Sequence, residues 1–390
     1  MRLAPFTLPL ALLAACAGAP PAPSAHAPRA PVAAVASSAA PFDAGADADG
    51  AIPPPMAPAS ALADGIVFEE AAAIRAIAQD ERYLFLGTSA GVVARSKSDA
   101  TRRPLSGELS FTRDRLVVAG ADLYWPAYGG IQRVAKSGPP EVKPFAGNGM
   151  DVDDLTCDGV DLYWSTGFVA RTGAEVESQL FRGSPASGAV ETLWKGLGSV
   201  LVGAYDADSI YFRVTPVKGP TRWLTLRKHD RTVAPWSLAL DKKNAITSML
   251  AVHEGRALVA VLSVAEMVVH TKVEPGALMP SLTVERTGYL LYAADARGQR
   301  PVLLAGEMCP LDPPPTSLGR APRNLRVAGA WIYWACQFPA TIHRMPVGGG
   351  AVETVVTVTG AFVDYVVDGP KLYWAEVGER SVVRVKTLAP

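Results

Sequence analysis

Carboxylates crowd one short stretch of this chain, and carboxylate oxygens are the ligands that Ca²⁺ prefers in proteins. The stretch contains Asp151, Asp153, Asp154, Asp158 and Asp161. It lacks the glycine and the terminal glutamate that a calcium-binding loop places at set positions. We therefore expect a solvated loop here and no metal site.

A second pair of side chains, Glu266 and His270, has the spacing at which two metal ligands share one face of a helix. The segment 264–270 has the pattern of an extended strand, so the spacing creates no shared helix face. The sequence also lacks a Gly-x-Ser-x-Gly nucleophile elbow, a phosphate-binding glycine loop and a Cys-x-x-Cys pair. It therefore predicts no catalytic residue, no metal and no cofactor.

The charge balance argues against a nucleic-acid partner. The chain contains 37 basic and 37 acidic side chains, so it has no net charge that would attract a polyanion. Arg102, Arg103, Arg113 and Arg115 form a small basic cluster, which we interpret as solvated strand ends rather than a nucleic-acid patch.

The first residues have the features of a bacterial export signal. A basic residue follows the initiator Met, and the apolar run over 3–14 is too short to span a bilayer. The run ends in Leu13-Ala14-Ala15-Cys16, which resembles the lipobox where a diacylglyceryl group is attached to the cysteine. The resemblance implies a signal peptide over 1–15 and membrane attachment through a lipid on Cys16. By the same resemblance, Ala17 favours the outer membrane, with the protein facing the periplasm or the cell surface.

Residues 17–64 are dominated by Ala, Pro, Ser and Gly. Such a segment cannot bury enough apolar area to offset the entropy of ordering, so we expect a disordered tether. As a flexible coil it would reach about 35–40 Å. Together with the lipidated cysteine it makes up residues 16–64, and it separates the lipid surface from a folded domain over 65–390.

A three-residue string recurs along the folded domain and determines the predicted architecture. The clear copies are Tyr83-Leu84-Phe85, Leu123-Tyr124-Trp125, Leu162-Tyr163-Trp164, Ile210-Tyr211-Phe212, Ile332-Tyr333-Trp334 and Leu372-Tyr373-Trp374. The long gap before Ile332 holds one degenerate copy, Ala257-Leu258-Val259. Together they indicate seven repeats with a period of about 40 residues.

Each copy lies between segments that have the character of further short strands and turns. Asp158-Gly159 and Asp368-Gly369 suit the tight turn that joins two strands. Segments such as 130–134 and 350–355 follow the copies as third and fourth strands. Four strands per repeat predict an all-β fold, a seven-bladed β-propeller of four-stranded antiparallel blades.

The recurring string suits the second strand of a blade, which is buried on both sides by the neighbouring blades. Because side chains alternate along a strand, Leu123 and Trp125 should face one neighbouring blade and Tyr124 the other. We interpret these aromatic residues as core packing rather than as an aromatic ligand site.

The strings resemble the YWTD-type propellers of the low-density lipoprotein receptor group and related bacterial envelope propellers. The resemblance extends over most of residues 66–390 at the level of the repeat pattern. The chain departs from that family after the aromatic pair, where Pro126-Ala127 and Ser165-Thr166 stand in place of Thr-Asp. The resemblance therefore implies the blade architecture and not the family's ligand specificity.

The last repeat lacks a fourth strand, because the chain ends shortly after the third strand at 381–385. A strand-like segment, 66–69, is left over before the first repeat. We expect this N-terminal segment to pair with 382–385 as the outer strand of the last blade and so to close the ring.

The turns from second to third strand share one face of a propeller with the connections between blades, because strands in a blade alternate in direction. This long-loop face carries the longest insertions: 165–178, 213–223, 263–287 and 307–320. Long loops on a rigid scaffold are frequent binding sites, and insertions without a binding role explain them equally well. The candidate ligand-binding residues are Phe168, Arg171, Glu175, Arg213, Lys218, Arg222 and Trp223.

Three cysteines remain after Cys16. Cys309 lies on the long connection after the fifth repeat, and Cys336 ends the second strand of the sixth. Both fall on the long-loop face, and in an oxidising compartment they are expected to form a disulfide. Cys157 lies by a turn on the opposite face and is expected to be a buried free thiol.

These observations favour a non-catalytic binding or scaffold module that is anchored in the cell envelope and presents its long-loop face to a protein or glycan. The alternative is a propeller enzyme of lactonase, lyase or glycosidase type with its site at the central channel. Such enzymes draw single residues from several blades, which no linear motif would reveal.

Overall fold

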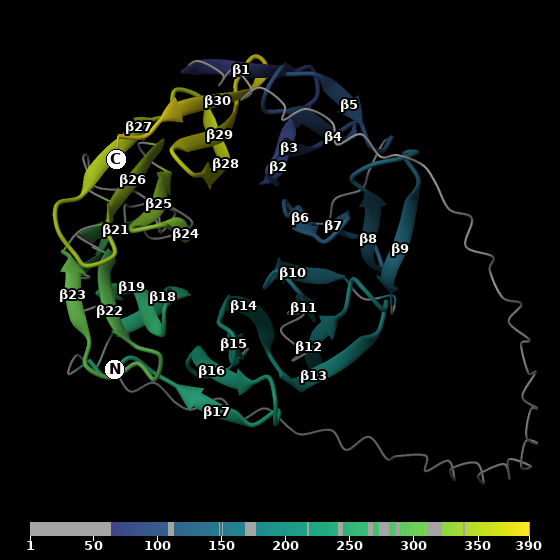
Figure 1. Cartoon of the computed structure of the whole chain (residues 1–390). Coiled ribbons are helices and arrows are strands. Elements are labelled where there is room, and N and C mark those ends of the chain that lie inside the picture. The colour runs from purple at the N-terminus through teal and green to yellow at the C-terminus, as the bar shows by residue number, and fades with distance from the viewer. Residues whose placement is uncertain are drawn as a thin grey trace, which may run out of the picture. The chain divides into compact units, whose positions relative to one another are not determined.

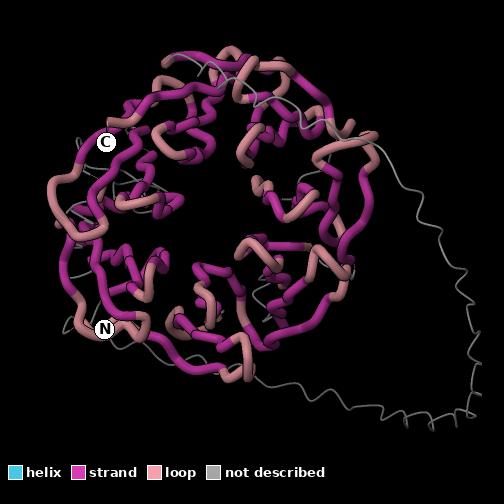
Figure 2. The backbone as a smooth tube through the Cα atoms, in the orientation of Figure 1, coloured by secondary structure: helices cyan, strands magenta, loops and turns pink. Residues whose placement is uncertain are grey.

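The computed structural model is an all-β ring of seven four-stranded antiparallel sheets (Figures 1 and 2). It describes residues 64–107, 113–147, 149, 151–167, 177–216, 218–240, 245–263, 268–272, 281–285, 289–306, 308–309, 322–337 and 340–389. Within these ranges no segment is helical, and none is a helix long and apolar enough to cross a membrane. The export signal, Cys16 and the tether lie outside the described residues.

Each blade runs from an inner strand at the centre of the ring to an outer strand at its rim (Figure 1). Blade 1 contains β2 (Ile74–Gln79), β3 (Tyr83–Thr88), β4 (Gly91–Ser96) and β5 (Arg102–Pro104). Blade 2 contains β6 (Val117–Ala119), β7 (Asp122–Ala127), β8 (Gly130–Ala135) and β9 (Val142–Gly147). Blade 3 contains β10 (Val152–Cys157), β11 (Leu162–Thr166), β12 (Glu177–Gly183) and β13 (Val190–Leu197). Blade 4 contains β14 (Ser199–Tyr205), β15 (Ser209–Thr215), β16 (Arg222–Arg227) and β17 (Val233–Trp236).

The remaining three blades follow in chain order around the ring. Blade 5 contains β18 (Ala245–His253), β19 (Arg256–Ser263), β22 (Tyr289–Asp295) and β23 (Val302–Ala305), and its insertion holds a separate hairpin of β20 (Val268–Lys272) and β21 (Ser281–Glu285). Blade 6 contains β24 (Arg323–Ala328), β25 (Trp331–Gln337), β26 (Ala340–Pro346) and β27 (Glu353–Thr357). Blade 7 contains β28 (Ala361–Asp368), β29 (Lys371–Val377), β30 (Ser381–Thr387) and, as its outer strand, β1 (Gly65–Glu70).

The N-terminal strand β1 contacts two blades. It pairs antiparallel with β30 of blade 7, with Phe68 opposite Val383. The carboxylate of Glu70, which is buried, forms an ion pair of 2.7 Å with Arg95 of blade 1. β1 therefore links the first and last blades through backbone hydrogen bonds on one side and a buried charge pair on the other.

The recurring aromatic string packs between blades as its alternation predicts. Leu123 and Trp125 of blade 2 lie in a buried cluster with residues of blade 1. Tyr124, between them, lies in a different cluster with Leu162 and Trp164 of blade 3. The same division recurs around the ring, so the aromatic residues fill the space between neighbouring sheets.

Blade 1 differs from the sequence alignment by one residue. Leu84 and Leu86 pack toward blade 7, whereas Phe85 packs toward blade 2. The structural equivalent of Leu-Tyr-Trp is therefore Leu84-Phe85-Leu86 and not Tyr83-Leu84-Phe85. The sequence match was made on the aromatic residue Phe85, whereas the register is determined by the neighbouring blade toward which each residue packs. The degenerate copy in blade 5 is aligned correctly, since Ala257 and Val259 face blade 4 and Leu258 faces blade 6.

The expected disulfide between Cys309 and Cys336 is present. It joins the connection after blade 5 to β25 of blade 6, where the Met308 carbonyl also accepts a hydrogen bond of 2.7 Å from the Trp334 indole. Cys157 is a free thiol, but it is only half-buried rather than buried. It ends the inner strand β10 and so lines the central cavity described next.

Candidate functional site

A cavity of about 750 Å³ occupies the centre of the ring and is lined mainly by the inner strands. Charged and amide side chains gather where these strands begin, which is the end of the cavity on the long-loop face. We call this end the channel mouth and define it by Arg115, Asp154, Arg213, Asn324, Arg326 and Asp364. The volume lies in the range of small-ligand sites, so the mouth is a candidate binding site.

Two aspartates of blade 3 meet two arginines of blade 2 at the mouth. Arg113 contacts Asp153 at 2.7 Å, and Arg115 approaches Asp154 at 3.5 Å. The aspartate side chains are only 5% and 13% exposed. A β-bulge between Val152 and Asp154 places both adjacent side chains among these partners.

This arrangement corrects two expectations. The acidic stretch is not a solvated loop at these positions, because β10 begins at Val152 and holds Asp153 and Asp154 in its bulge. Arg113 and Arg115 are not merely solvated strand ends, because they form ion pairs with these two carboxylates. The pairing joins residues one repeat apart, which a local inspection of either segment does not detect.

A second charged group stands on the other side of the cavity, because blades 6 and 7 follow blade 3 at half a turn of the ring. Arg326 of blade 6 donates to both carboxylate oxygens of Asp364 in blade 7, at 3.1 and 3.0 Å. The Asn324 amide donates to the same carboxylate at 2.6 Å. Asp364 is 8% exposed, so its charge is compensated almost entirely by protein groups.

Blade 4 contributes a guanidinium and an indole to the cavity wall. Arg213 lies on β15 opposite Leu201 of the inner strand, and both residues line the cavity. Trp223 lies over Gly203, where a Cβ would stand only 2.2 Å from the indole ring. Glycine at 203 therefore lets the indole reach the cavity wall past the inner strand.

At the mouth, burial disfavours the ionised forms of two groups of opposite charge, the Asp154 carboxylate and the Arg213 guanidinium. Burial raises the pKa of Asp154, and the nearby Arg115 offsets this effect only in part. Burial also lowers the pKa of Arg213, against the attraction of Asp154. In both groups the effect of burial on the pKa outweighs that of the opposite charge nearby, a pattern that is frequent at functional sites.

The residues proposed from sequence have different outcomes. Arg213 and Trp223 line the cavity. Lys218 and Arg222 are exposed on the long-loop face outside the cavity lining. Phe168, Arg171 and Glu175 lie outside the described residues, so their roles stay predictions.

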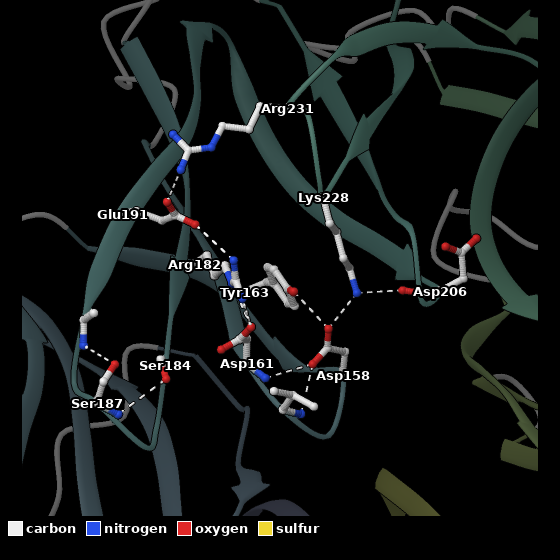
Figure 3. Close-up of polar contacts among 12 residues, drawn as sticks. Asp158, Asp161, Tyr163, Arg182, Ser184, Ser187, Glu191, Asp206, Lys228 and Arg231 are labelled. Atoms are coloured by element: carbon white, nitrogen blue, oxygen red, sulfur yellow. Dashed lines mark hydrogen bonds and ion pairs between the residues drawn. The ribbon is translucent and has the colours of Figure 1, made fainter.

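The opposite face carries a polar contact between blades 3 and 4 that sequence reasoning missed (Figure 3). The Asp158 carboxylate accepts hydrogen bonds from the Tyr163 hydroxyl at 2.9 Å and from the Lys228 ammonium at 2.6 Å. Its other oxygen accepts from the amides of Val160 and Asp161 in the turn. Burial alone would raise the pKa of Asp158, but these bonds outweigh it and lower the pKa to about 2.

Related ion pairs recur at two other interfaces between blades. Asp80 of blade 1 contacts Lys136 of blade 2 at 3.0 Å, and Asp368 of blade 7 contacts Lys97 of blade 1 at 2.6 Å. We call these pairs, with Asp158–Lys228, the turn clamps. Because each joins one blade to the next at a corresponding position, we assign them to stability.

A sequence signal for the turn clamps exists. Asp80 and Asp158 each stand four residues before the leucine of the structural repeat, at Leu84 and Leu162. The clamp lysines each follow directly after a third strand. The signal was missed because Asp158 and Asp368 were interpreted only as turn residues, while their lysine partners lie on neighbouring blades.

Within the described ranges, no three His, Cys, Asp or Glu side chains are grouped so that they could hold a metal ion. No family model matches the chain, and no curated protein matches it.

Solved structures share the architecture. The chain is similar to an oligogalacturonate lyase in complex with manganese, with TM-score 0.54 and 10% identity over 79% of this chain and 86% of that chain. An oligogalacturonate lyase from Vibrio parahaemolyticus gives TM-score 0.53 and 8% identity over 80% and 88%. The β-propeller domain of the Trilobed protease from Pyrococcus furiosus gives TM-score 0.50 and 11% identity over 82% and 99%. At such identities the likeness shows the fold alone: this chain carries a seven-bladed β-propeller.

Proposed function

We propose that this chain is a non-catalytic binding or scaffold module, lipid-anchored in the cell envelope, and that its ligand binds at the channel mouth. The ligand is a protein segment or a glycan that enters from the long-loop face. The lipid on Cys16 and the tether over 17–64 hold the propeller near the membrane.

The observation that supports this proposal best is the state of the charges at the mouth. Asp154 and Arg213 are partly buried in the cavity wall, and burial shifts the pKa of each in the direction that favours its neutral form. A ligand that hydrogen-bonds to the Asp154 carboxylate recovers hydration that burial removed, and Arg213 lines the same cavity wall. The turn clamps offer no comparable opportunity, because the clamp carboxylate Asp158 already accepts four hydrogen bonds.

The enzyme alternative has one observation in its favour. The raised pKa of Asp154, caused by burial, is the property that a general acid requires. Two of the similar structures are oligogalacturonate lyases, although they resemble this chain only in fold. Turnover of an oligosaccharide that is abolished by Asp154→Asn would favour this alternative over the binding module.

Capture of a ligand by the intact chain tests the binding function. Wild-type protein, Arg213→Met and Arg227→Met are immobilised in detergent and exposed to solubilised envelope from the source cells. Arg227 is the matched control, because it lies on the neighbouring strand β16 and is an exposed arginine paired with Asp230, outside the cavity lining. We expect wild type and Arg227→Met to retain the same ligand and Arg213→Met to lose it.

Retention of the ligand by all three proteins would contradict a site at the mouth. Absence of any retained ligand, together with turnover in a lyase and hydrolase screen, would contradict the binding module itself.

The anchor is tested separately. Growth with a labelled fatty acid should label the wild-type chain and not Cys16→Ala, and the variant should leave the membrane fraction. Membrane association of Cys16→Ala equal to wild type would contradict the lipid attachment.

A further inference from the structure

We propose that the outer strand of blade 5 is a docking site for an extended, acidic segment of a partner protein, which adds to the blade as a fifth strand. The site consists of β23 and the turn before it, residues 295–301, and we call it the blade 5 edge. It lies at the rim of the ring (Figure 1), apart from the channel mouth. The proposal therefore goes beyond the ligand site proposed above.

The first argument is the composition of the outer strands. β23 pairs with β22 on one side and is the last strand of its sheet. The open edge of a strand is a template for another chain, and proteins usually protect it with charged residues or proline. The other six outer strands contain such residues: Arg102 and Pro104 in β5, Lys143 and Pro144 in β9, Glu191 and Lys195 in β13, Pro235 in β17, Glu353 in β27 and Glu70 in β1. The sequence of β23, Val-Leu-Leu-Ala, contains none.

The second argument is the exposure of apolar side chains on both faces of β23. Val302 is 58% exposed and Leu303 is 51% exposed, and alternation places them on opposite faces of the sheet. The turn before β27 of blade 6 lies beside this strand, because a Cβ on Gly349 would stand 3.4 Å from the Leu304 side chain. Val352 in that turn is also exposed. An added strand therefore has apolar side chains to pack against on both faces.

The third argument is the charge at the start of β23. Arg297 and Arg300 are exposed in the turn before the strand. The acidic residue of the turn, Asp295, accepts hydrogen bonds from the backbone amides of Arg297 and Gln299. Within the part of the chain that the structure describes, neither guanidinium forms an ion pair. The turn therefore carries a net positive charge that complements a carboxylate.

The position of this charge sets the direction and the chemistry of the partner segment. In antiparallel pairing, the more frequent kind, the C-terminal end of the added strand lies beside the start of β23. The segment is therefore a short apolar strand followed by acidic residues. Main-chain hydrogen bonds give such a segment affinity even on a short edge. A second copy of the ring is less suitable, because a stable dimer uses about 20–30 residues on each side.

Peptide binding to the intact chain in detergent tests the proposal. The probe is a fluorescein-labelled peptide of five alternating threonines and valines followed by two aspartates. One control peptide ends in two lysines, and another has proline at the central position. By fluorescence anisotropy, we expect the acidic peptide to bind at least about fivefold more tightly than the lysine peptide, because two exposed ion pairs are replaced by repulsion. Proline should weaken binding by about tenfold, because it removes a strand hydrogen bond and restricts the backbone.

Variants of the chain locate the site. Leu303→Gln should weaken binding of the acidic peptide by about fivefold, because it removes apolar contact area. Leu197→Gln is the matched control, since Leu197 is 54% exposed on the outer strand β13, and it should bind as wild type. Replacing Arg297 and Arg300 together by Gln should abolish the preference for the acidic peptide. Thermal unfolding checks that each variant is folded, and hydrogen exchange of amides 302–304 should slow when the peptide is bound.

Four results would overturn the proposal. Failure of the acidic peptide to bind below about 1 mM would do so, since this is the range of a weak specific ligand. Equal affinity for the acidic and lysine peptides would exclude the acidic partner, and equal affinity for the proline peptide would exclude strand addition. Dimers of the wild type that dissociate in Leu303→Gln would assign the edge to a second copy of the chain.

Discussion

Two aspartates at opposite ends of one strand show how the two faces of the ring differ. Asp154 lies near the start of β10 at the channel mouth, and Asp158 follows the end of the same strand. Burial raises the pKa of Asp154, whereas four hydrogen bonds outweigh burial at Asp158 and lower its pKa to about 2. An aspartate carboxylate at the channel mouth is therefore not fully compensated for its burial, whereas the one on the opposite face is compensated by its hydrogen bonds.

The difference separates stability from function. A turn clamp holds a satisfied carboxylate between two blades, and comparable pairs occur at three interfaces. The mouth differs from blade to blade, with Asp154, Arg326 and Asp364 on some inner strands and Leu201 and Met249 on others. Contacts that recur between blades indicate a structural role. Residues that differ from blade to blade indicate a site that recognises a ligand.

The largest effect is expected at an interface that has no turn clamp and carries a disulfide on the long-loop face instead. This is the interface of blades 5 and 6. His253 occupies the position of the clamp aspartate there, and Val347 occupies that of the lysine. The disulfide joins the connection after blade 5 to blade 6. Replacing Cys309 and Cys336 together by Ser should lower the free energy of unfolding by about 3 kcal/mol. Chemical denaturation under non-reducing conditions measures the loss, and an unchanged midpoint would contradict this role of the bond.

The next largest effect concerns the clamp of blades 3 and 4. Lys228→Met should lower the free energy of unfolding by about 2 kcal/mol, because a mostly buried carboxylate loses its charged partner. Arg227→Met, the adjacent control, should change it by less than about 0.5 kcal/mol, because its ion pair with Asp230 is exposed. Equal losses for the two variants would remove the distinction between clamp and surface pair.

The clamp also predicts a dependence on pH. The pKa of Asp158 is lowered in the folded state to about 2, from an ordinary value near 3.8. Its contribution to stability is therefore complete above the unfolded pKa and is lost as the pH falls through the folded one. The stability difference between wild type and Lys228→Met, followed by denaturation from pH 6 downward, should narrow as the pH falls below about 4. A constant difference would show that the lost stability does not depend on the ionised carboxylate.

The smallest effect is the construction of a new clamp. Asp206 of blade 4 accepts hydrogen bonds from the turn and from the Tyr211 hydroxyl, as Asp158 does, but Ala296 of blade 5 occupies the lysine position. Ala296→Lys should raise the free energy of unfolding by about 0.5 kcal/mol, the contribution of a partly exposed ion pair. Destabilisation by this substitution, in the same denaturation assay, would contradict the equivalence of the interfaces.

The parts that the sequence predicts are those governed by local pattern. Leu123, Tyr124 and Trp125 reveal their two packing directions through alternation alone, and seven such strings define the blades. Cys309 and Cys336 could be paired because strand order places both on one face. The first copy was displaced by one residue because Phe85 resembles the aromatic residue of the other copies while Leu86 occupies its place.

The parts that the sequence does not reveal are contacts between blades. Arg113 and Asp153 are 40 residues apart, and each looks like an ordinary surface charge in its own segment. Only the stacking of one repeat on the next brings them together. Opposite charges one repeat apart, as also in Arg75 and Asp114, are a signal that could have predicted part of the mouth.

The most direct test of this account combines capture and stability in two variants, Arg213→Met at the mouth and Lys228→Met in the clamp. Envelope capture by the intact chain and the free energy of unfolding are measured for both. We predict that Arg213→Met loses the ligand while its stability changes by less than about 1 kcal/mol, and that Lys228→Met loses stability while it keeps the ligand. Loss of the ligand in Lys228→Met with retention in Arg213→Met would contradict the assignment of binding to the mouth and of stability to the opposite face.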